Sequence, residues 1–225
     1  MLIFGHRGAS FDHAENTIPA FHAAIQQGAD GAELDVRRTS DGFLVVHHDP
    51  ALRDGRMICD IRRTELPERV PTLFEALIAC GSLLVNIEIK NTPDEPGFEA
   101  DRRISVDTLA VLDALTDPPP VIVSSFDFAS IEMIKATSPR TRTGYLVMAA
   151  SQPIDAVERC VDGGHEAVHP WDPLVDAAVI ERCHEASLAV NVWTVDDPDR
   201  IIQLAAWGAD GVVTNRPALA RSALG

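Results

Sequence analysis

The amino-acid sequence predicts an α/β protein folded as a closed (β/α)8 barrel, and three observations support this prediction. Short apolar runs alternate with amphipathic helical patterns along the whole 225-residue chain, and repeated strand-then-helix units produce a parallel sheet. A barrel of this kind reaches ~200–250 residues as one domain. Polar residues follow the ends of many runs, whereas an open doubly wound sheet, the alternative fold, would gather them at one switch point. We therefore expect a single domain over residues 1–225.

Nine apolar runs have the length and composition of buried strands. In chain order they are Leu2 to Gly5, Gly31 to Arg37, Leu44 to His48, Leu83 to Ile89, Val121 to Ser125, Thr143 to Val147, Ala167 to Pro170, Ala189 to Val195 and Gly211 to Thr214. The run from Leu44 to His48 is interpreted as a hairpin partner or extra piece beside the second strand. Eight strands then remain, each followed by a helical pattern, as the barrel requires.

The helical patterns have apolar residues at a spacing of three or four and recognisable starts. Ile18, Phe21 and Ile25 recur at this spacing directly after Glu15-Asn16-Thr17, which reads as a capping region. Pro71-Thr72 suits the first turn of a second helix. Further helices are expected around Ile104 to Leu112, Phe128 to Thr137, Ile154 to Val161, Ala177 to Ala186, Pro198 to Trp207 and Pro217 to Leu224.

The composition limits the classes of partner and compartment. The chain has 34 acidic and 19 basic residues and a formal net charge of −15, which argues against nucleic acid and anionic membranes as partners. A local cationic pocket can still bind an anionic small molecule. No apolar stretch approaches the ~20 residues of a membrane span, and no signal-peptide pattern is visible at the N-terminus. The scattered cysteines form no C-x-x-C pair and are expected to be reduced thiols, so we expect a cytoplasmic location: Cys59, Cys80, Cys160 and Cys183.

The central feature of the sequence is Glu33-Leu34-Asp35. Alternate side chains of a strand point to the same face, so Glu33 and Asp35 are expected to lie side by side. Two carboxylates at this distance repel each other and raise each other's pKa. A hard divalent cation offsets the repulsion, because Mg²⁺ and Ca²⁺ prefer oxygen ligands. The alternative is an edge strand with one acid facing inward and one facing solvent.

The strand from Leu83 to Ile89 carries a second polar pattern. Alternation places Asn86, Glu88 and Lys90 on one face, with Ile87 and Ile89 on the other. The apolar pair is expected to face the helices, which leaves the polar triplet inside the barrel. Charged groups there are costly unless they are paired or coordinated, so this pattern indicates a site rather than packing.

Polar residues at other strand ends are expected to join this site, because function in such barrels collects at the C-terminal ends of the strands. His6-Arg7-Gly8 follows the first strand, His47-His48-Asp49 follows the extra strand, and Asn191-Val192-Trp193-Thr194 lies at the seventh strand. Histidine titrates near neutrality and suits acid–base work. Arginine offers a fork of donors to phosphoryl oxygens, whereas lysine acts as a point charge.

The motifs as an ordered set resemble the glycerophosphodiester phosphodiesterase family. They are His6-Arg7-Gly8, Glu15-Asn16-Thr17, Glu33-Leu34-Asp35-Val36, Thr39-x-Asp41-Gly42, Val45-Val46-His47-His48-Asp49, Asn86-Ile87-Glu88-Ile89-Lys90, Val192-Trp193-Thr194-Val195 and Gly208-Ala209-Asp210-Gly211. Each motif alone is weak evidence, but all of them in order are specific. The resemblance implies a TIM barrel, a divalent metal cofactor (Mg²⁺ or Ca²⁺), and hydrolysis of a small-molecule glycerophosphodiester to an alcohol and glycerol 3-phosphate.

The resemblance also implies a role for individual residues. It places metal ligands at Glu33, Asp35 and Glu88, and paired catalytic histidines at His6 and His48. It places substrate-binding groups at three further positions, with the first two meeting the phosphate and the last lying at the mouth of the barrel: Arg7, Lys90 and Trp193. The sequence leaves open which histidine is the base, and whether water or a glycerol hydroxyl is the nucleophile.

Several residues near these motifs are interpreted as structural. His47 is expected to point away from the barrel interior because it neighbours His48 on a strand, and His169 is treated as surface or packing, although it ends a strand and so has a possible place at the pocket. Asn16 suits either a helix cap or a contact behind the site, and Phe126 either a pocket wall or packing.

The chain departs from the family between Asp49 and Pro71, where the usual insertion after the second strand is shortened. In longer members this insertion caps the site, so the alcohol side of the pocket is expected to be more open. Two functional alternatives remain at this stage. One is a lysophospholipase D-type phosphodiesterase that uses the same site, and the other is a non-catalytic barrel that binds a phosphate ligand.

Overall fold

The structure is a computed structural model that describes residues 1–148 and 153–225, and it confirms the predicted barrel. The strands form one sheet in the order β1-β9-β8-β7-β6-β5-β4-β2-β3, and an additional β1–β2 pairing closes it. Their bounds are β1 (Leu2–Gly5), β2 (Gly31–Arg38), β3 (Leu44–Val46), β4 (Leu84–Ile89), β5 (Val121–Ser125), β6 (Arg142–Val147), β7 (Ala167–Pro170), β8 (Ala189–Val192) and β9 (Gly211–Thr214). The β2–β3 pairing is antiparallel, so β3 is the predicted hairpin partner and the other eight strands form the parallel barrel.

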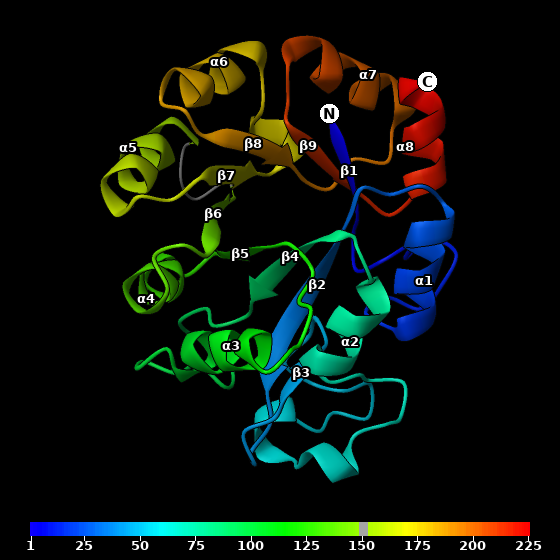
Figure 1. Cartoon of the computed structure of the whole chain (residues 1–225), viewed down its shortest axis with the longest axis vertical. Coiled ribbons are helices and arrows are strands. Elements are labelled where there is room, and N and C mark those ends of the chain that lie inside the picture. Colours follow the sequence, from blue (N-terminus) through cyan, green and yellow to red (C-terminus); the bar gives the residue numbers. More distant parts are fainter. Residues whose placement is uncertain (149–152) are drawn as a thin grey trace.

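Helices surround the strands, as Figure 1 shows. They are α1 (Ile18–Gln26), α2 (Leu73–Cys80), α3 (Arg103–Asp113), α4 (Phe128–Thr137), α5 (Pro153–Gly163), α6 (Ala177–Glu185), α7 (Pro198–Trp207) and α8 (Pro217–Leu224). Short 3-10 helices occur at η1 (Ile58–Asp60), η2 (Arg63–Glu65) and η3 (Asp172–Leu174). No helix in these two described ranges is long and apolar enough to cross a membrane. The four cysteines are free thiols.

Side-chain caps fix the starts of the helices next to the predicted site. The hydroxyl of Thr17 accepts from the amide of Ala20 at the start of α1. Thr72 and Glu75 form a reciprocal capping box at the start of α2, which satisfies two amides that the helix leaves free. Thr17 therefore caps α1, and the neighbouring Asn16 is available for another contact.

Two strands end earlier than the sequence predicts. β3 ends at Val46 rather than His48, and β8 ends at Val192 rather than Val195. The β3 ladder covers only the last residues of β2. Residues 36–38 of β2 pair with β3, while residues 31–32 pair with β1 to close the barrel. Beyond Val46 the His47 amide still donates to the Asp35 carbonyl at 3.0 Å, and the chain then bends at His48.

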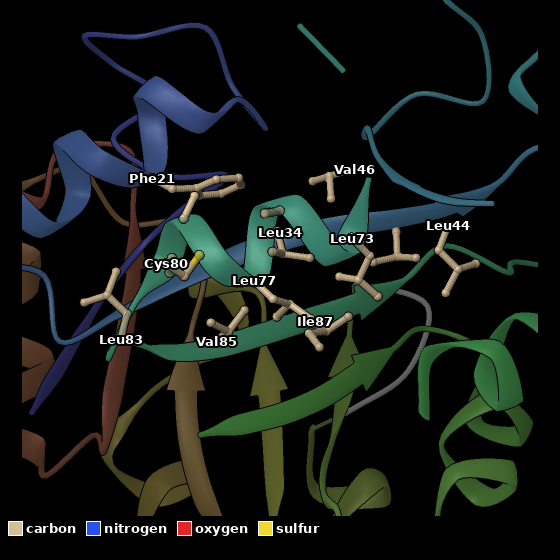
Figure 2. Close-up of a cluster of buried hydrophobic side chains, with 14 of the residues drawn as sticks. Phe21, Leu34, Leu44, Val46, Leu73, Leu77, Cys80, Leu83, Val85 and Ile87 are labelled. Carbon is tan, nitrogen blue, oxygen red and sulfur yellow. The ribbon is translucent and has the colours of Figure 1, made fainter. Parts of the chain in front are cut away.

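The predicted alternation on β2 and β4 separates the core from the barrel interior. Leu34 and Ile87 are fully buried, with 0% exposure, and pack in one cluster with Phe21 of α1 and Leu77 of α2. Figure 2 shows these side chains between the two strands and the two helices. The outward face of both strands is thus an apolar surface under helices, and the inward face carries the polar residues.

The short segment between β3 and α2, residues 47–72, has a small core of its own. It lies outside the barrel beside β2 and β3, in cyan in Figure 1. Its turns and 3-10 helices are held by a cluster of buried side chains: Val45, Leu52, Ile58, Ile61, Leu66 and Val70. The segment is therefore an ordered wall on one side of the barrel mouth.

The alternation on β4 generates a stability prediction. Replacing Ile87 with alanine should lower the free energy of unfolding by ~2–5 kcal/mol, because it leaves a cavity between β4 and α2. Ile78, which is 60% exposed on α2, is the matched control, and Ile78→Ala should change the same quantity by less than ~0.5 kcal/mol. Urea unfolding followed by circular dichroism measures both. Equal losses for the two variants would contradict the assigned faces.

Candidate active site

Three buried carboxylates meet at the C-terminal ends of β2 and β4. Glu33 and Asp35 are on the inward face of β2, and the parallel register places Glu88 of β4 opposite Asp35. Each residue offers an oxygen that lies within 4.8 Å of the others. Their exposures are 4%, 0% and 8% in that order. The structure therefore brings together the three acids that the sequence singled out.

Two cations lie against these carboxylates. The Lys90 ammonium is 2.6 Å from Glu88 Oε1 and 3.3 Å from Asp35 Oδ1. Arg7 Nε is 3.2 Å from Asp35 Oδ2, and the backbone amide of Arg7 donates to Glu33 Oε2 at 2.8 Å. Asp35 also accepts from the amide group of Asn16 at 2.7 Å. Asp35 is thus held between two cations and one neutral donor.

The carboxylates consequently differ in pKa. Burial raises the pKa of Glu33 well above its usual range, and the charges of Asp35 and Glu88 raise it further. Burial also raises the pKa of Glu88, against the opposing charge of Lys90. Burial acts in the same direction on Asp35, but Lys90 and Arg7 outweigh it and lower the pKa to about 2. The negative charge of Glu33 is therefore the least compensated by neighbouring cations, and that of Asp35 is the most compensated.

The donor set fits a hard divalent cation. Glu33 Oε1 is buried and has no hydrogen-bond partner among the described residues, although an unpaired buried oxygen of this kind is costly. A cation at the centre of the three carboxylates would satisfy it and would reduce their mutual repulsion. Carboxylate oxygens suit Mg²⁺ and Ca²⁺ alike, so the geometry indicates the class of ion and not the element.

A tight turn after β1 delivers Arg7 to this cluster. Arg7 has a φ of +55° and Gly8 a φ of +83°, which is the left-handed region that most side chains avoid. A Cβ on Gly8 would lie 2.6 Å from the backbone of Ala20 in α1, so only glycine fits there. The turn directs the guanidinium back over Asp35, where Glu15 also pairs with it at 3.0 Å.

A hydrogen-bond chain orients His6 at the end of β1. Its Nδ1 lies 2.7 Å from Asn215 Oδ1, and the amide nitrogen of Asn215 donates to Asp196 Oδ2 at 2.6 Å. Because this amide nitrogen donates to a carboxylate, Asn215 Oδ1 faces the ring and accepts a hydrogen bond from the protonated Nδ1. His6 Nε2 is then left unprotonated in the neutral ring, 4.0 Å from Glu33 Oε2. Burial and the charge of Arg7 lower the pKa of His6.

His48 lies on the other side of the site, in the bend after β3. Its Nδ1 is 2.8 Å from Asp49 Oδ1, and its charge contributes to the low pKa of Asp35. His47 lines the same cleft as His48, with its Nδ1 2.9 Å from the Asp49 carbonyl, and its orientation away from the barrel interior stays a prediction. Strand alternation does not determine this orientation, because the strand ends at Val46.

Aromatic and polar residues in β7 and directly after β5 and β8 complete the barrel interior. Trp193 is half-buried, and its ring packs edge-on against Phe126 with centroids 5.6 Å apart. The Trp193 indole donates to the carbonyl of His169 at 2.8 Å. His169 is fully buried, which lowers its pKa to about 3. It lines a small cavity of about 20 Å³ together with Glu33 and Glu88, so it belongs to the interior rather than to the surface.

Comparison with known proteins identifies the family of this chain. The Glycerophosphoryl diester phosphodiesterase family matches the chain over residues 6–219. The chain belongs to this family. A glycerophosphodiester phosphodiesterase of Caldanaerobacter subterraneus subsp. tengcongensis is 30% identical over 236 residues, covering 96% of this chain and 94% of the relative. The family resemblance read from the motifs is thereby confirmed, and the chain is an enzyme that acts as a phosphoric diester hydrolase.

Solved structures of family members match along the whole fold. An Oleispira antarctica phosphodiesterase, in complex with the product sn-glycerol-3-phosphate, has a TM-score of 0.90 and 26% identity, covering 100% of this chain and 96% of that one. A Thermotoga maritima glycerophosphodiester phosphodiesterase has a TM-score of 0.84 and 28% identity, covering 99% and 97%.

Some residues at this phosphodiesterase site were missed in the sequence. Arg37 shares the inward face of β2, where it donates to the His48 carbonyl at 2.7 Å and pairs with Glu95 at 3.0 Å. The period-2 pattern through Glu33 and Asp35 already predicts this face for Arg37. Asn215 and Asp196 gave no comparable signal, because they lie in loops that only the closed barrel brings to His6.

The unequal compensation of the carboxylates predicts opposite effects on the stability of the metal-free enzyme. Glu33→Gln should raise the free energy of unfolding at pH 7.5, because it removes the least compensated buried charge. Asp35→Asn should lower it by about 3 kcal/mol, because it leaves the Arg7 and Lys90 charges without their shared partner. Urea unfolding in the presence of a chelator measures both. A shift in the same direction for the two variants would contradict the assigned electrostatics.

Proposed function

We propose that the enzyme hydrolyses glycerophosphodiesters in a metal-dependent reaction, giving an alcohol and glycerol 3-phosphate. The observation that carries this proposal is the cluster of three buried carboxylates with an unpaired Glu33 oxygen, flanked by two histidines that have separate orienting partners. A family member with glycerol 3-phosphate bound as product supports the same reaction here. We also propose a cytoplasmic location, which the free thiols support.

Glu33, Asp35 and Glu88 would hold the divalent cation, Mg²⁺ or Ca²⁺. When bound, this ion would supply positive charge for an oxygen of the substrate phosphate. Arg7 and Lys90 add further positive charge at the edge of the same cluster. A phosphodiester gains negative charge toward its transition state, and cations that are already in place stabilise it there. Trp193 would cover the glycerol half of the substrate at the barrel mouth.

The hydrogen-bond geometry supports different roles for the histidines. His6 presents an unprotonated Nε2 to the site because Asn215 accepts from Nδ1, so it is suited to remove a proton from the nucleophile. His48 directs Nδ1 to the Asp49 carboxylate, which orients its other nitrogen to protonate the departing alcohol. The nucleophile is either water or the neighbouring glycerol hydroxyl, and the second route would form a cyclic phosphate that water then opens.

Metal dependence is tested with chelated enzyme. The apoenzyme should not hydrolyse glycerophosphocholine or glycerophosphoethanolamine, because the negative charge of the carboxylates repels the phosphodiester when no cation is bound. Addition of Mg²⁺, Ca²⁺ or Mn²⁺ should restore the release of glycerol 3-phosphate. Glu88→Gln should weaken this restoration, measured as a higher metal concentration for half-maximal activity. Turnover that survives chelation would contradict the assigned cofactor.

The same assay separates the alternative functions. Faster turnover of a lysophospholipid than of the glycerophosphodiesters would identify a lysophospholipase D-type enzyme. Binding of glycerol 3-phosphate without turnover of any substrate, with each metal in turn, would identify a non-catalytic barrel.

The roles of the histidines are tested with leaving groups of different basicity. His6→Ala and His48→Ala should each slow hydrolysis of a natural alkyl substrate by ~10²–10⁴-fold. With a nitrophenyl phosphodiester, whose leaving group needs little protonation, His48→Ala should recover most activity and His6→Ala should not. His47→Ala is the matched control, because it removes the neighbouring histidine, and it should lose little activity with either substrate. Recovery by His6→Ala instead would reverse the assigned base and acid.

A further inference from the structure

A large cleft adjoins the catalytic cluster on the side of His48. It has a volume of about 610 Å³, which is within the usual range for a small-molecule site. One wall comes from the segment before α1, including Glu15, and the other from residues 47–53 and 69–70 of the shortened insertion. Because His48 and Asp49 line it, the cleft begins where the departing alcohol of the proposed reaction would receive its proton.

Two arginines of the insertion, Arg53 and Arg69, line this cleft and are exposed to solvent. Within residues 1–148 and 153–225, neither arginine has a carboxylate oxygen within 4.0 Å, the limit for an ion pair. By contrast, Arg56 pairs with Asp54 and Arg63 pairs with Glu75. Three arginines of this segment have no acidic partner among the described residues, namely Arg53, Arg62 and Arg69, and of these only Arg53 and Arg69 line the cleft.

The acids that line the cleft are already engaged. Glu15 pairs with Arg7 at 3.0 Å, and Asp49 pairs with His48 at 2.8 Å. Arg53 and Arg69 are therefore uncompensated positive charges in a chain whose formal net charge is −15. A local field opposite to the global one indicates that the cleft receives an anion.

The backbone fixes both arginines at the cleft wall. Arg53 follows the buried Leu52, in a turn closed by hydrogen bonds from Leu52 N to Arg56 O and from Gly55 N to Leu52 O, each 2.9 Å long. Arg69 precedes the buried Val70, whose amide donates to Pro67 O at 3.0 Å. Leu52 and Val70 belong to the same buried cluster of the insertion. The two positions are therefore held as parts of one rigid wall.

We propose that this cleft binds the alcohol half of the substrate and selects alcohols that carry a negative charge, such as a second phosphate ester. The proposal rests on the proposed function, because it uses the phosphodiester position and the role of His48 given there. The concave shape of the cleft and the formal net charge of −15 of the whole chain favour a small anion over an anionic membrane surface.

The test compares two synthetic substrates with the same glycerol 3-phosphate half. One has propanol as the leaving alcohol, and the other has propanol with a phosphate on its third carbon. The metal-loaded wild-type enzyme should have a higher kcat/KM for the phosphorylated substrate. In Arg53→Gln/Arg69→Gln this kcat/KM should fall about tenfold at low salt, because the variant removes two exposed charges that would attract the added phosphate. The kcat/KM for the neutral substrate should not change.

The double variant Arg62→Gln/Arg140→Gln is the control, because it removes the same charge from exposed positions that do not line the cleft. This control variant should keep the wild-type preference for the phosphorylated substrate. In the wild-type enzyme, 0.5 M NaCl should reduce this preference, because salt screens the exposed charges. Two results would overturn the proposal while leaving the proposed function intact. One is an equal kcat/KM of the wild-type enzyme for the two substrates, and the other is an equal loss of kcat/KM for both substrates in Arg53→Gln/Arg69→Gln.

Two further outcomes would also overturn it. Binding of anionic phospholipid vesicles that is lost in the cleft variant, with an unchanged substrate preference, would assign the arginines to a membrane surface. Failure of the metal-loaded enzyme to hydrolyse either substrate would reject the proposed function and this inference together, and it is distinguished from the other outcomes by the absence of any turnover.

Discussion

The burial of three carboxylates at the C-terminal ends of β2 and β4 is the constraint on which the rest of the site depends. Glu33, Asp35 and Glu88 lie within 4.8 Å of one another, and their repulsion in a region shielded from water is costly. Arg7 and Lys90 compensate mainly Asp35. The left-handed turn at Arg7, the asparagine that binds Asp35 and the unpaired oxygen of Glu33 all follow from this arrangement. In the proposed function, a divalent cation held by the three carboxylates would offset the remaining imbalance of charge.

The same strands build the core and the site, and their alternation keeps the two functions apart. On β2, Leu34 faces the helices while Glu33 faces the interior, and on β4 Ile87 and Glu88 are divided in the same way. Packing on the outer face therefore fixes the strand positions without using the inner side chains. This separation allows the interior to carry unfavourable charge, since the stability of the barrel comes from the outer layer.

The sequence predicted those features that depend on local periodicity. The order of strands and helices, the hairpin partner β3 and the meeting of Glu33, Asp35 and Glu88 all follow from period-2 and helical patterns. It predicted less well where tertiary contacts decide. The end of β3 was predicted two residues too late, because its ladder with β2 stops at Val46. Asn215 and Asp196 were missed because ring closure, and no local pattern, brings them to His6.

The two sides of the site differ in how they are built, and this difference bears on specificity. The inner side uses residues at strand ends, so a change there disturbs both the sheet and the charge balance. The outer side uses the segment at residues 47–72, which packs on its own cluster of buried side chains. Arg53 and Arg69 project from that cluster without an acidic partner in the described parts of the chain. Under the proposed function, substitution of Arg53 or Arg69 would alter which alcohol is accepted without affecting the carboxylates, because the ion pairs of Asp35 and Glu88 are with Arg7 and Lys90 and not with these two arginines.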